Sequence, residues 1–286
     1  MAFVEGCWTH VGGSKVFPSL RNREVCRASL RSRKSCGRRG ARLSMSSSDV
    51  IETGTVSRQV CAIVLAGGVG KRMKADVPKQ FLVLDGQTIL HRSLELFLSL
   101  PEVTEVVLVV DESYHEDYAD LSGGDRQLHF ASPGKERQDS VYNGLQKATV
   151  NDAGLICVHD AARPLVTPEE IRKVLNDAET HGAAVLGVPC KATVKESEDG
   201  SFVLRTIQRS RLWEVQTPQV VEKKVLTEGF DLVREQDLEV TDDVSIVEQL
   251  GKPVKLTMGE YTNIKITTPE DLPIAESILN ARKSFP

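Results

Sequence analysis

From Val60 onward, short apolar runs alternate with stretches in which apolar residues recur at helical spacing. The short runs are nearly continuous in Val, Ile and Leu, which is typical of strands that are buried on both faces of a parallel sheet. The expected strands are VCAIVLA (60–66), EVVLVVD (105–111), QLHFASPG (127–134), GLICVHD (154–160), AAVLGVPC (183–190) and PVKLTM (253–258). This alternation predicts an α/β fold with a doubly wound, mostly parallel sheet.

Two helix starts carry the same local signal. Thr167, Pro168 and Glu170 supply a cap, a proline in the first turn and an acid at the third helical position, and an apolar helical pattern follows. Thr268 and Pro269 repeat this arrangement before the last helical pattern of the chain. The sequence therefore predicts helices that begin near residues 168 and 269.

One stretch departs from the alternation of strands and helices. Between residues 191 and 219, apolar and polar residues alternate on both sides of the polar turn Glu198-Asp199-Gly200, which predicts a long hairpin. We expect a β-arm at about 189–219. An isolated hairpin is not stable, so this arm must lie against another surface. We expect a second copy of the chain, and hence a homodimer; the alternative is that the arm packs on its own domain.

The N-terminal segment differs in charge from the remainder. Ten of the 36 lysines and arginines but only three of the 40 acids lie in residues 1–50, which leaves 26 basic and 37 acidic residues, about −11, in 51–286. An Arg- and Ser-rich, acid-poor segment without a continuous apolar run resembles an organelle transit peptide. We expect residues 1–57 to be a disordered, cleaved transit peptide and residues 58–286 to be the folded domain; the alternative is a basic tail that stays attached.

Composition also excludes several classes of protein. Cys61, Cys157 and Cys190 each lie singly within apolar runs, which favours buried, reduced thiols. We find no C-x-x-C or H-E-x-x-H pattern typical of a zinc site. The acidic body is unsuited to general nucleic-acid binding, and no apolar stretch reaches the roughly 18 residues of a membrane span. We therefore expect neither a nucleic-acid partner nor a membrane partner.

The stretch LAGGVGKRMKADVPKQF (65–81) joins a glycine cluster to several cations. It is not a P-loop, because Arg72 follows Gly70 and Lys71 where a Ser or Thr is needed. It is not a dinucleotide fingerprint, because the spacing that starts at Gly68 ends on Met73. A glycine turn after a strand, followed by cations, remains suited to a polyphosphate. The cations are Lys71, Arg72, Lys74 and Lys79.

Other polar segments also follow predicted strands, where ligands of parallel sheets collect. They are GKERQDS (134–140), HDAARP (159–164) and NIK (263–265). Backbone N–H groups near the glycines could approach phosphates, while Arg72, Lys79 and Lys265 could offset charge on a phosphorus under attack. Asp160 could hold Mg²⁺ or a sugar hydroxyl. Each of these residues taken alone could have an ordinary structural role. The hypothesis of a nucleoside triphosphate site therefore rests on their combination.

The order of these motifs resembles a known family. AGGVGKRM…PKQF, GKERQDSV, HDAARP, TPQ and NIKITTPEDL are similar to successive motifs of the 2-C-methyl-D-erythritol 4-phosphate cytidylyltransferases, from about Val60 to the C-terminus. The resemblance implies a nucleotidyltransferase, Rossmann-like sheet with a protruding β-arm that clasps a second subunit. It also implies that CTP reacts with methylerythritol phosphate in isoprenoid biosynthesis, with Mg²⁺ as cofactor.

The family's site residues carry over by position. The resemblance implies catalytic roles for Arg72, Lys79 and Lys265, and metal binding by Asp160. The residues implied for CTP are Ala66, Gly67, Gly68, Gly70, Gly134, Ser140, Asp160 and Ala161. The residues implied for the acceptor are Thr193, Arg209, Thr217 and Thr241, some of them from a partner subunit.

Two features resemble plant-type members. Bacterial members commonly have Asp where Lys135 stands and an acid near Thr262, and the leader favours a plastid, the chloroplast stroma, over a mitochondrion. A ribitol 5-phosphate cytidylyltransferase is the nearest alternative, because it shares the CTP site and differs in the acceptor pocket. A nucleotide sensor without catalysis is a further alternative, but it would not need Arg72, Lys79 and Lys265.

Overall fold

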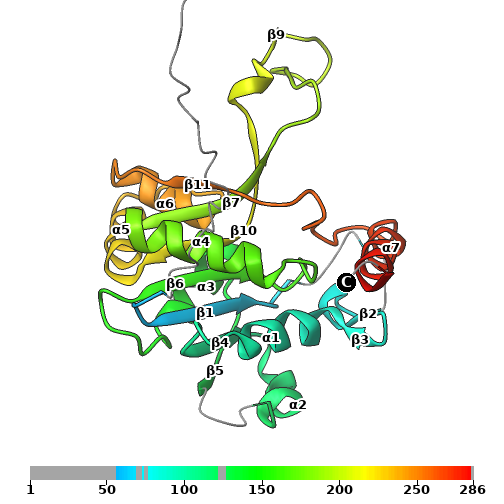
Figure 1. Cartoon of the computed structure of the whole chain (residues 1–286). Helices are drawn as coiled ribbons and strands as arrows, with labels where there is room; N and C mark the ends of the chain where they lie inside the picture. The colour runs from blue at the N-terminus through cyan, green and yellow to red at the C-terminus, as the bar shows by residue number, and fades with distance from the viewer. Residues whose placement is uncertain (1–55, 69–72, 74–76, 122–126, 285–286) are drawn as a thin grey trace, which may run out of the picture. The chain divides into compact units, whose positions relative to one another are not determined.

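The computed structural model of the 286-residue chain describes residues 56–68, 73, 77–121 and 127–284 (Figure 1). These residues belong to one compact unit, residues 51–286. The predictions for Gly70, Arg72 and nearly all of the expected transit peptide lie outside the described residues.

A seven-stranded sheet forms the centre of this unit, in the order β11-β7-β10-β6-β1-β4-β5. Only β10 runs antiparallel to its neighbours in the sheet. The strands are β1 (Val60–Leu65), β4 (Glu105–Val109), β5 (Gln127–Ala131), β6 (Leu155–Asp160), β7 (Ala183–Pro189), β10 (Trp213–Glu222) and β11 (Lys255–Met258). All six strands expected from the apolar runs are present, which confirms the mostly parallel sheet.

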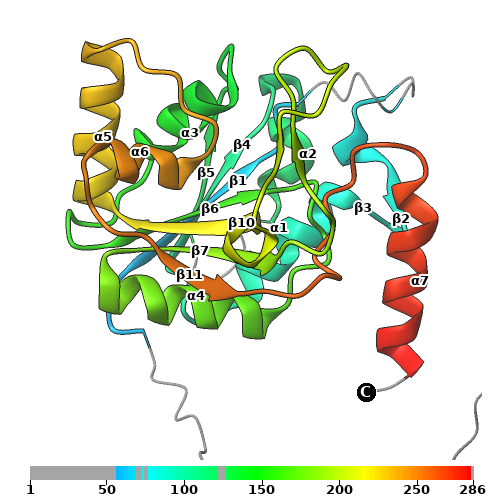
Figure 2. The ribbon, with the colours of Figure 1, turned by 90° about the horizontal axis from the view of Figure 1, so that it is seen from above.

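Helices cover both faces of the sheet, as a doubly wound fold requires. One buried cluster joins the sheet to α1 and α4, and a second joins the opposite face to α3, α5 and α6. Figure 2 shows α4 on one side of the sheet and α3, α5 and α6 on the other. The helices are α1 (Ile89–Ser99), α2 (His115–Ala119), α3 (Arg137–Leu145), α4 (Pro168–His181), α5 (Lys223–Glu235), α6 (Asp243–Gln249) and α7 (Asp271–Ser284).

The two predicted helix starts differ in outcome. Helix α4 begins at Pro168, and the Thr167 and Glu170 side chains form the expected capping box. Helix α7 begins at Asp271, two residues after Pro269. The Asp271 carboxylate accepts the backbone N–H groups of Thr267 and Thr268 at 2.7 and 2.8 Å, so it holds the segment that leads into this helix.

Shorter elements complete the described chain. The strands β2 (Val83–Leu84) and β3 (Gln87–Thr88) form a small hairpin. Three 3₁₀ turns, η2 (Lys79–Phe81), η3 (Glu112–Tyr114) and η4 (Arg209–Arg211), lie between larger elements.

The arm is shorter than the predicted range of 189–219. Its ladder consists of β8 (Lys195–Glu196) and β9 (Arg205–Thr206), and this loop extends away from the sheet in Figure 1. Residues 213–219 form part of β10, and its first residues continue the pairing of the predicted hairpin, with Trp213 opposite Pro189 and Val215 opposite Gly187. β10 then lies between β7 and β6 in the main sheet, so only the tip of the predicted hairpin protrudes.

Candidate active site

A cavity of about 400 Å³ opens at the carboxyl ends of β1 and β6, where Leu65 and Asp160 are partners in neighbouring strands. Ligands of open α/β sheets bind at this edge. Its described lining brings together eight predicted site residues: Ala66, Gly67, Gly68, Lys79, Gly134, Ser140, Asp160 and Lys265. Residues from four separate motifs therefore meet at one place, as the hypothesis of a common site required.

Two glycines allow the backbone around the cavity to pack closely. A Cβ on Gly67 would lie 2.5 Å from Cβ of Pro133, and a Cβ on Gly134 would lie 2.1 Å from Cβ of Asp139. The Gly134 N–H donates to Oγ of Ser140 at 3.0 Å, so this hydroxyl also holds the loop. Any larger residue at these two positions would push neighbouring segments apart.

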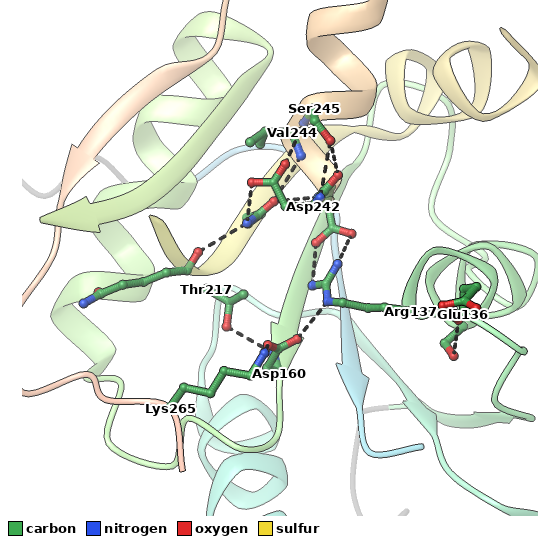
Figure 3. Close-up of polar contacts among 12 residues, drawn as sticks. Glu136, Arg137, Asp160, Thr217, Asp242, Val244, Ser245 and Lys265 are labelled. Carbon is green, nitrogen blue, oxygen red and sulfur yellow. Dashed lines mark hydrogen bonds and ion pairs between the residues drawn. The ribbon is translucent and has the colours of Figure 1, made fainter. Parts of the chain in front are cut away.

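Asp160 is the acidic centre of the cavity (Figure 3). Its Oδ2 lies 2.5 Å from Nζ of Lys265, and its Oδ1 lies 3.2 Å from Nε of Arg137. Burial alone would raise the pKa of this carboxyl, but the charges of Arg137 and Lys265 hold the pKa well below its usual range. Asp160 is therefore ionised at physiological pH, and it fixes the ammonium group of Lys265.

Arg137 and Asp243 are two residues for which the sequence predicted no role. The Arg137 guanidinium donates two bonds of 2.8 Å to the carboxylate of Asp243, at the start of α6, while also contacting Asp160. Asp243 is 1% exposed, and its burial raises the pKa of its carboxyl against the opposing effect of Arg137. The available signals were Arg137 within the GKERQDS motif and the acids that begin an otherwise apolar helix.

Lys79 lies beside the loop that carries Lys265. Its Nζ donates to the carbonyl oxygen of Ile266 at 3.0 Å. The next residue, Gln80, is buried and donates from Nε2 to the carbonyl oxygen of Ala66 at 2.6 Å. These bonds attach the 3₁₀ turn η2 both to the glycine loop and to the C-terminal segment.

Two predicted residues lie behind the lining of the cavity. Ala161 is 1% exposed; its N–H donates to the carbonyl of Leu65, and its carbonyl accepts from Oγ of Ser93. Thr217 is 4% exposed, and its Oγ1 accepts the backbone N–H of Asp160 at 3.1 Å. The structure thus places both residues next to the site without exposing them to a ligand.

The other predicted acceptor residues are separated from this cavity. Thr193 and Arg209 are exposed at the arm, and Nη1 of Arg209 donates to the carbonyl of Lys191 at 2.8 Å. Thr241 lines a neighbouring cavity of about 360 Å³ that also borders Arg137 and Asp243. Within the described part of this one chain, these three residues do not meet the lining of the site.

A larger cavity of about 630 Å³ lies on the other side of the glycine loop and shares Ala66, Gly67, Gly68 and Gln80 with the site. Its described lining contains Asp111 and Glu112 but no lysine or arginine. Among the described residues, the cations that suit a polyphosphate therefore line the smaller cavity.

Two further observations on the described residues concern metal ligands and membrane spans. We find no group of three or more His, Cys, Asp or Glu side chains placed to hold a metal ion in the described residues. Among the described helices, none combines the length and the apolar composition needed to cross a bilayer.

Comparison with known proteins assigns the chain to a family. The sequence model of 2-C-methyl-D-erythritol 4-phosphate cytidylyltransferase matches residues 60–281. A chloroplastic enzyme of this name from Oryza sativa subsp. japonica is 54% identical over 226 residues, which are 79% of this chain and 76% of the rice protein. The enzyme of this name from Pelotomaculum thermopropionicum is 43% identical over 229 residues, 79% of this chain and 96% of its own.

Solved structures agree with these sequence matches. A 4-diphosphocytidyl-2C-methyl-D-erythritol synthase from Anaerococcus prevotii superposes with a TM-score of 0.69 at 28% identity, covering 78% of this chain and 96% of its own. The 2-C-methyl-D-erythritol 4-phosphate cytidylyltransferase from Thermus thermophilus gives a TM-score of 0.62 at 31% identity, covering 78% and 99%. The chain belongs to the 2-C-methyl-D-erythritol 4-phosphate cytidylyltransferase family.

Proposed function

We propose that the chain transfers the cytidylyl group of CTP to 2-C-methyl-D-erythritol 4-phosphate. An oxygen of the acceptor phosphate forms a bond to the α-phosphorus of CTP, and the bond from that phosphorus to the β-phosphate bridging oxygen breaks. The products are 4-diphosphocytidyl-2-C-methyl-D-erythritol and pyrophosphate. The observation that carries this proposal is the placement of Lys265 on the ionised Asp160, opposite the glycine loop, in a chain of this family.

In this proposal, positively charged side chains stabilise the transition state. Phosphate-group transfer depends mainly on positioning and on stabilising the charge that develops at phosphorus, so a covalent nucleophile is not needed. Lys79 and Lys265 enter the same cavity, and Arg72 is the third catalytic residue that the sequence implies. The backbone of Ala66, Gly67 and Gly68, with Gly70, would hold the triphosphate.

The nucleoside would lie on the side of the cavity formed by Gly134 and Ser140. Gly134 presents backbone without a side chain, and Ser140 presents a hydroxyl that already holds the Gly134 N–H. Asp160 would meet the ribose. A ribose contact by Ala161 stays a prediction, because its N–H and its carbonyl are both bonded within the fold.

Asp160 is also the residue that would hold Mg²⁺. Mg²⁺ is commonly held by one or two carboxylates together with substrate phosphates, so one protein carboxylate beside a bound triphosphate fits this ion. Both oxygens of Asp160 contact cations, and the ion would compete with Lys265 and Arg137 for them. When bound, Mg²⁺ would neutralise charge on the phosphates.

We assign the acceptor to residues of the arm, supplied by a second copy of the chain. Thr193 and Arg209 lie on the arm, away from the cavity of their own chain, and the arm exposes Phe202, Val203 and Leu204 by 80%, 61% and 55%. An exposed apolar group on a short hairpin favours contact with another protein surface. A homodimer would bring one chain's arm to the other's cavity, where Thr217 and Thr241 are already close.

The composition of the N-terminal segment supports a location in the plastid. We propose that residues 1–57 are a transit peptide removed on entry into the plastid, and that residues 58–286 form the enzyme. The Arg- and Ser-rich composition supports this proposal, as does the rice relative, which is named as chloroplastic.

The proposed function is tested by pyrophosphate release from the full-length chain with CTP and Mg²⁺. Methylerythritol phosphate and ribitol 5-phosphate are compared as acceptors, and omission of each acceptor measures CTP hydrolysis. We expect release that depends on methylerythritol phosphate and is strongly reduced in Lys265→Ala. A preference for ribitol phosphate would overturn the acceptor, and CTP binding without release on either acceptor would support a sensor.

A further inference from the structure

His159 lies directly before Asp160 at the end of β6 and is fully buried. Its ring packs against Phe97 of α1, with the ring centres 5.0 Å apart. Nδ1 lies 3.1 Å from Oγ1 of Thr217, and Nε2 lies 3.2 Å from the carbonyl oxygen of Arg163. We infer that His159, acting through Thr217, is a positioning residue that fixes Asp160 and Lys265 for phosphate-group transfer. This inference rests on the proposed function.

The direction of each hydrogen bond follows from the partners. The carbonyl of Arg163 can only accept, so Nε2 of His159 carries the proton and Nδ1 is left as an acceptor. The Thr217 hydroxyl therefore donates to Nδ1, while its oxygen accepts the backbone N–H of Asp160 at 3.1 Å. Three hydrogen bonds in a row hold the backbone on both sides of the turn that contains Asp160.

Burial supports the neutral form of the imidazole. None of the His159 surface is exposed, and burial lowers the pKa of His159 to about 3, although Asp160 alone would raise it. Arg163 and Arg137 act in the same direction as burial.

The same group of residues also fixes the segment that carries Lys265. Asn263 is fully buried, and its Nδ2 donates to the carbonyl of Thr217 at 3.0 Å. Nη1 of Arg163 donates to the carbonyl of Asn263 at 2.7 Å. Asn263 lies two residues before Lys265. Thr217 and Arg163 therefore contact both the segment that carries Asp160 and the segment that carries Lys265.

This arrangement gives Thr217 a different role from the one that the family resemblance implies. Its hydroxyl proton is committed to His159, and one lone pair is committed to Asp160. With 4% of its surface exposed, Thr217 lies under the site and is not placed as an acceptor ligand. It acts on the reaction through the placement of Asp160.

The tautomer can be measured directly on the ¹⁵N-labelled full-length chain. Long-range ¹H–¹⁵N spectra identify His159 by the signal that is lost in His159→Asn. At pH 7.5 we expect a protonated Nε2 and an unprotonated, hydrogen-bonded Nδ1. A proton on Nδ1 would overturn the inference whether or not the chain is active on methylerythritol phosphate.

Kinetics of isosteric variants test the effect on the reaction. In Thr217→Val, we expect kcat to fall roughly 10- to 100-fold, with both KM values within about threefold, because small misplacements of reacting groups have effects of this size. Thr217→Ser should restore most of kcat. His159→Asn, which keeps an acceptor for Thr217, should stay more active than His159→Leu, which has none.

Thr257→Val is the matched control, because Thr257 is equally buried and donates its hydroxyl to Asp177 at 2.6 Å. It should lose stability while its kcat stays within about twofold. If Thr217→Val raised KM for the acceptor and left kcat unchanged, Thr217 would be an acceptor ligand and the inference would be wrong. A wild-type chain without any transfer activity would instead count against the proposed function.

Discussion

The cavity at the ends of β1 and β6 and the arm between β7 and β10 are built in opposite ways. At the cavity, Arg137, Asp160 and Lys265 come from distant parts of the chain and satisfy one another through ion pairs. At the arm, a two-residue ladder is surrounded by exposed residues, including Phe202 and Leu204. The nucleotide half of the proposed site is thus organised within one chain, whereas the acceptor half is proposed to come in part from a second.

The largest expected effect tests the cavity. Lys265→Ala should lower kcat roughly 10²- to 10³-fold, about 3–4 kcal/mol of transition-state stabilisation, while the Kd for CTP changes little. Steady-state kinetics and CTP titration measure the two effects separately. Lys283→Ala, which breaks the exposed pair with Asp85, is the matched control and should leave both unchanged. Equal losses of CTP affinity and rate would remove Lys265 from its catalytic role.

The second prediction compares buried and exposed ion pairs. Asp243→Asn weakens the bidentate contact with Arg137 and should lower the free energy of unfolding by about 2 kcal/mol, because the guanidinium loses two hydrogen bonds to a charged partner and keeps only Asp160. Glu228→Gln removes the exposed pair with Lys252 and should cost less than about 1 kcal/mol. Urea unfolding of both variants measures the difference. Similar values for both would mean that the buried pair does not hold the cavity together.

The third prediction uses pH to distinguish a buried His159 from a solvent-exposed histidine. The pKa of His159 is about 3 in the folded chain, below its ordinary value, so its contribution to stability is complete above about pH 6.5 and is lost as the pH falls. This loss should reach about 2 kcal/mol by pH 5, and His159→Asn should not show it. The stability difference between wild type and variant should therefore shrink between pH 7 and pH 5 in urea unfolding. A constant difference would mean that His159 titrates normally.

The smallest expected effect tests the arm. Arg209→Ala should raise KM for methylerythritol phosphate roughly tenfold, about 1.4 kcal/mol, and leave CTP binding and folding stability intact. Arg205→Ala is a matched control on the same hairpin, where the arginine pairs with Glu196 and is not assigned to the acceptor. An unchanged acceptor KM in Arg209→Ala would remove this residue from the site and weaken the case for a shared one.

The sequence predicted local features best where a single short-range pattern was sufficient. The six strands and helix α4 follow from apolar runs and a capping box, which act over a few residues. It did not predict that the second half of the hairpin, β10, also pairs with β6 inside the main sheet, because alternation reveals a strand but not all of its partners. It also gave no role to Arg137 and Asp243, since an ion pair between residues 106 positions apart has no local signature.

The sequence by itself determined the class of fold, the family and the motifs that line the cavity, because each is carried by the order and spacing of residues along the chain. Only the tertiary structure decided which charges meet, that Thr217 and Ala161 lie behind the lining, and that His159 is enclosed between Phe97 and Thr217. Burial and electrostatic interactions depend on distance in space, and the protonation of His159 and Asp160 therefore became evident only from the folded chain.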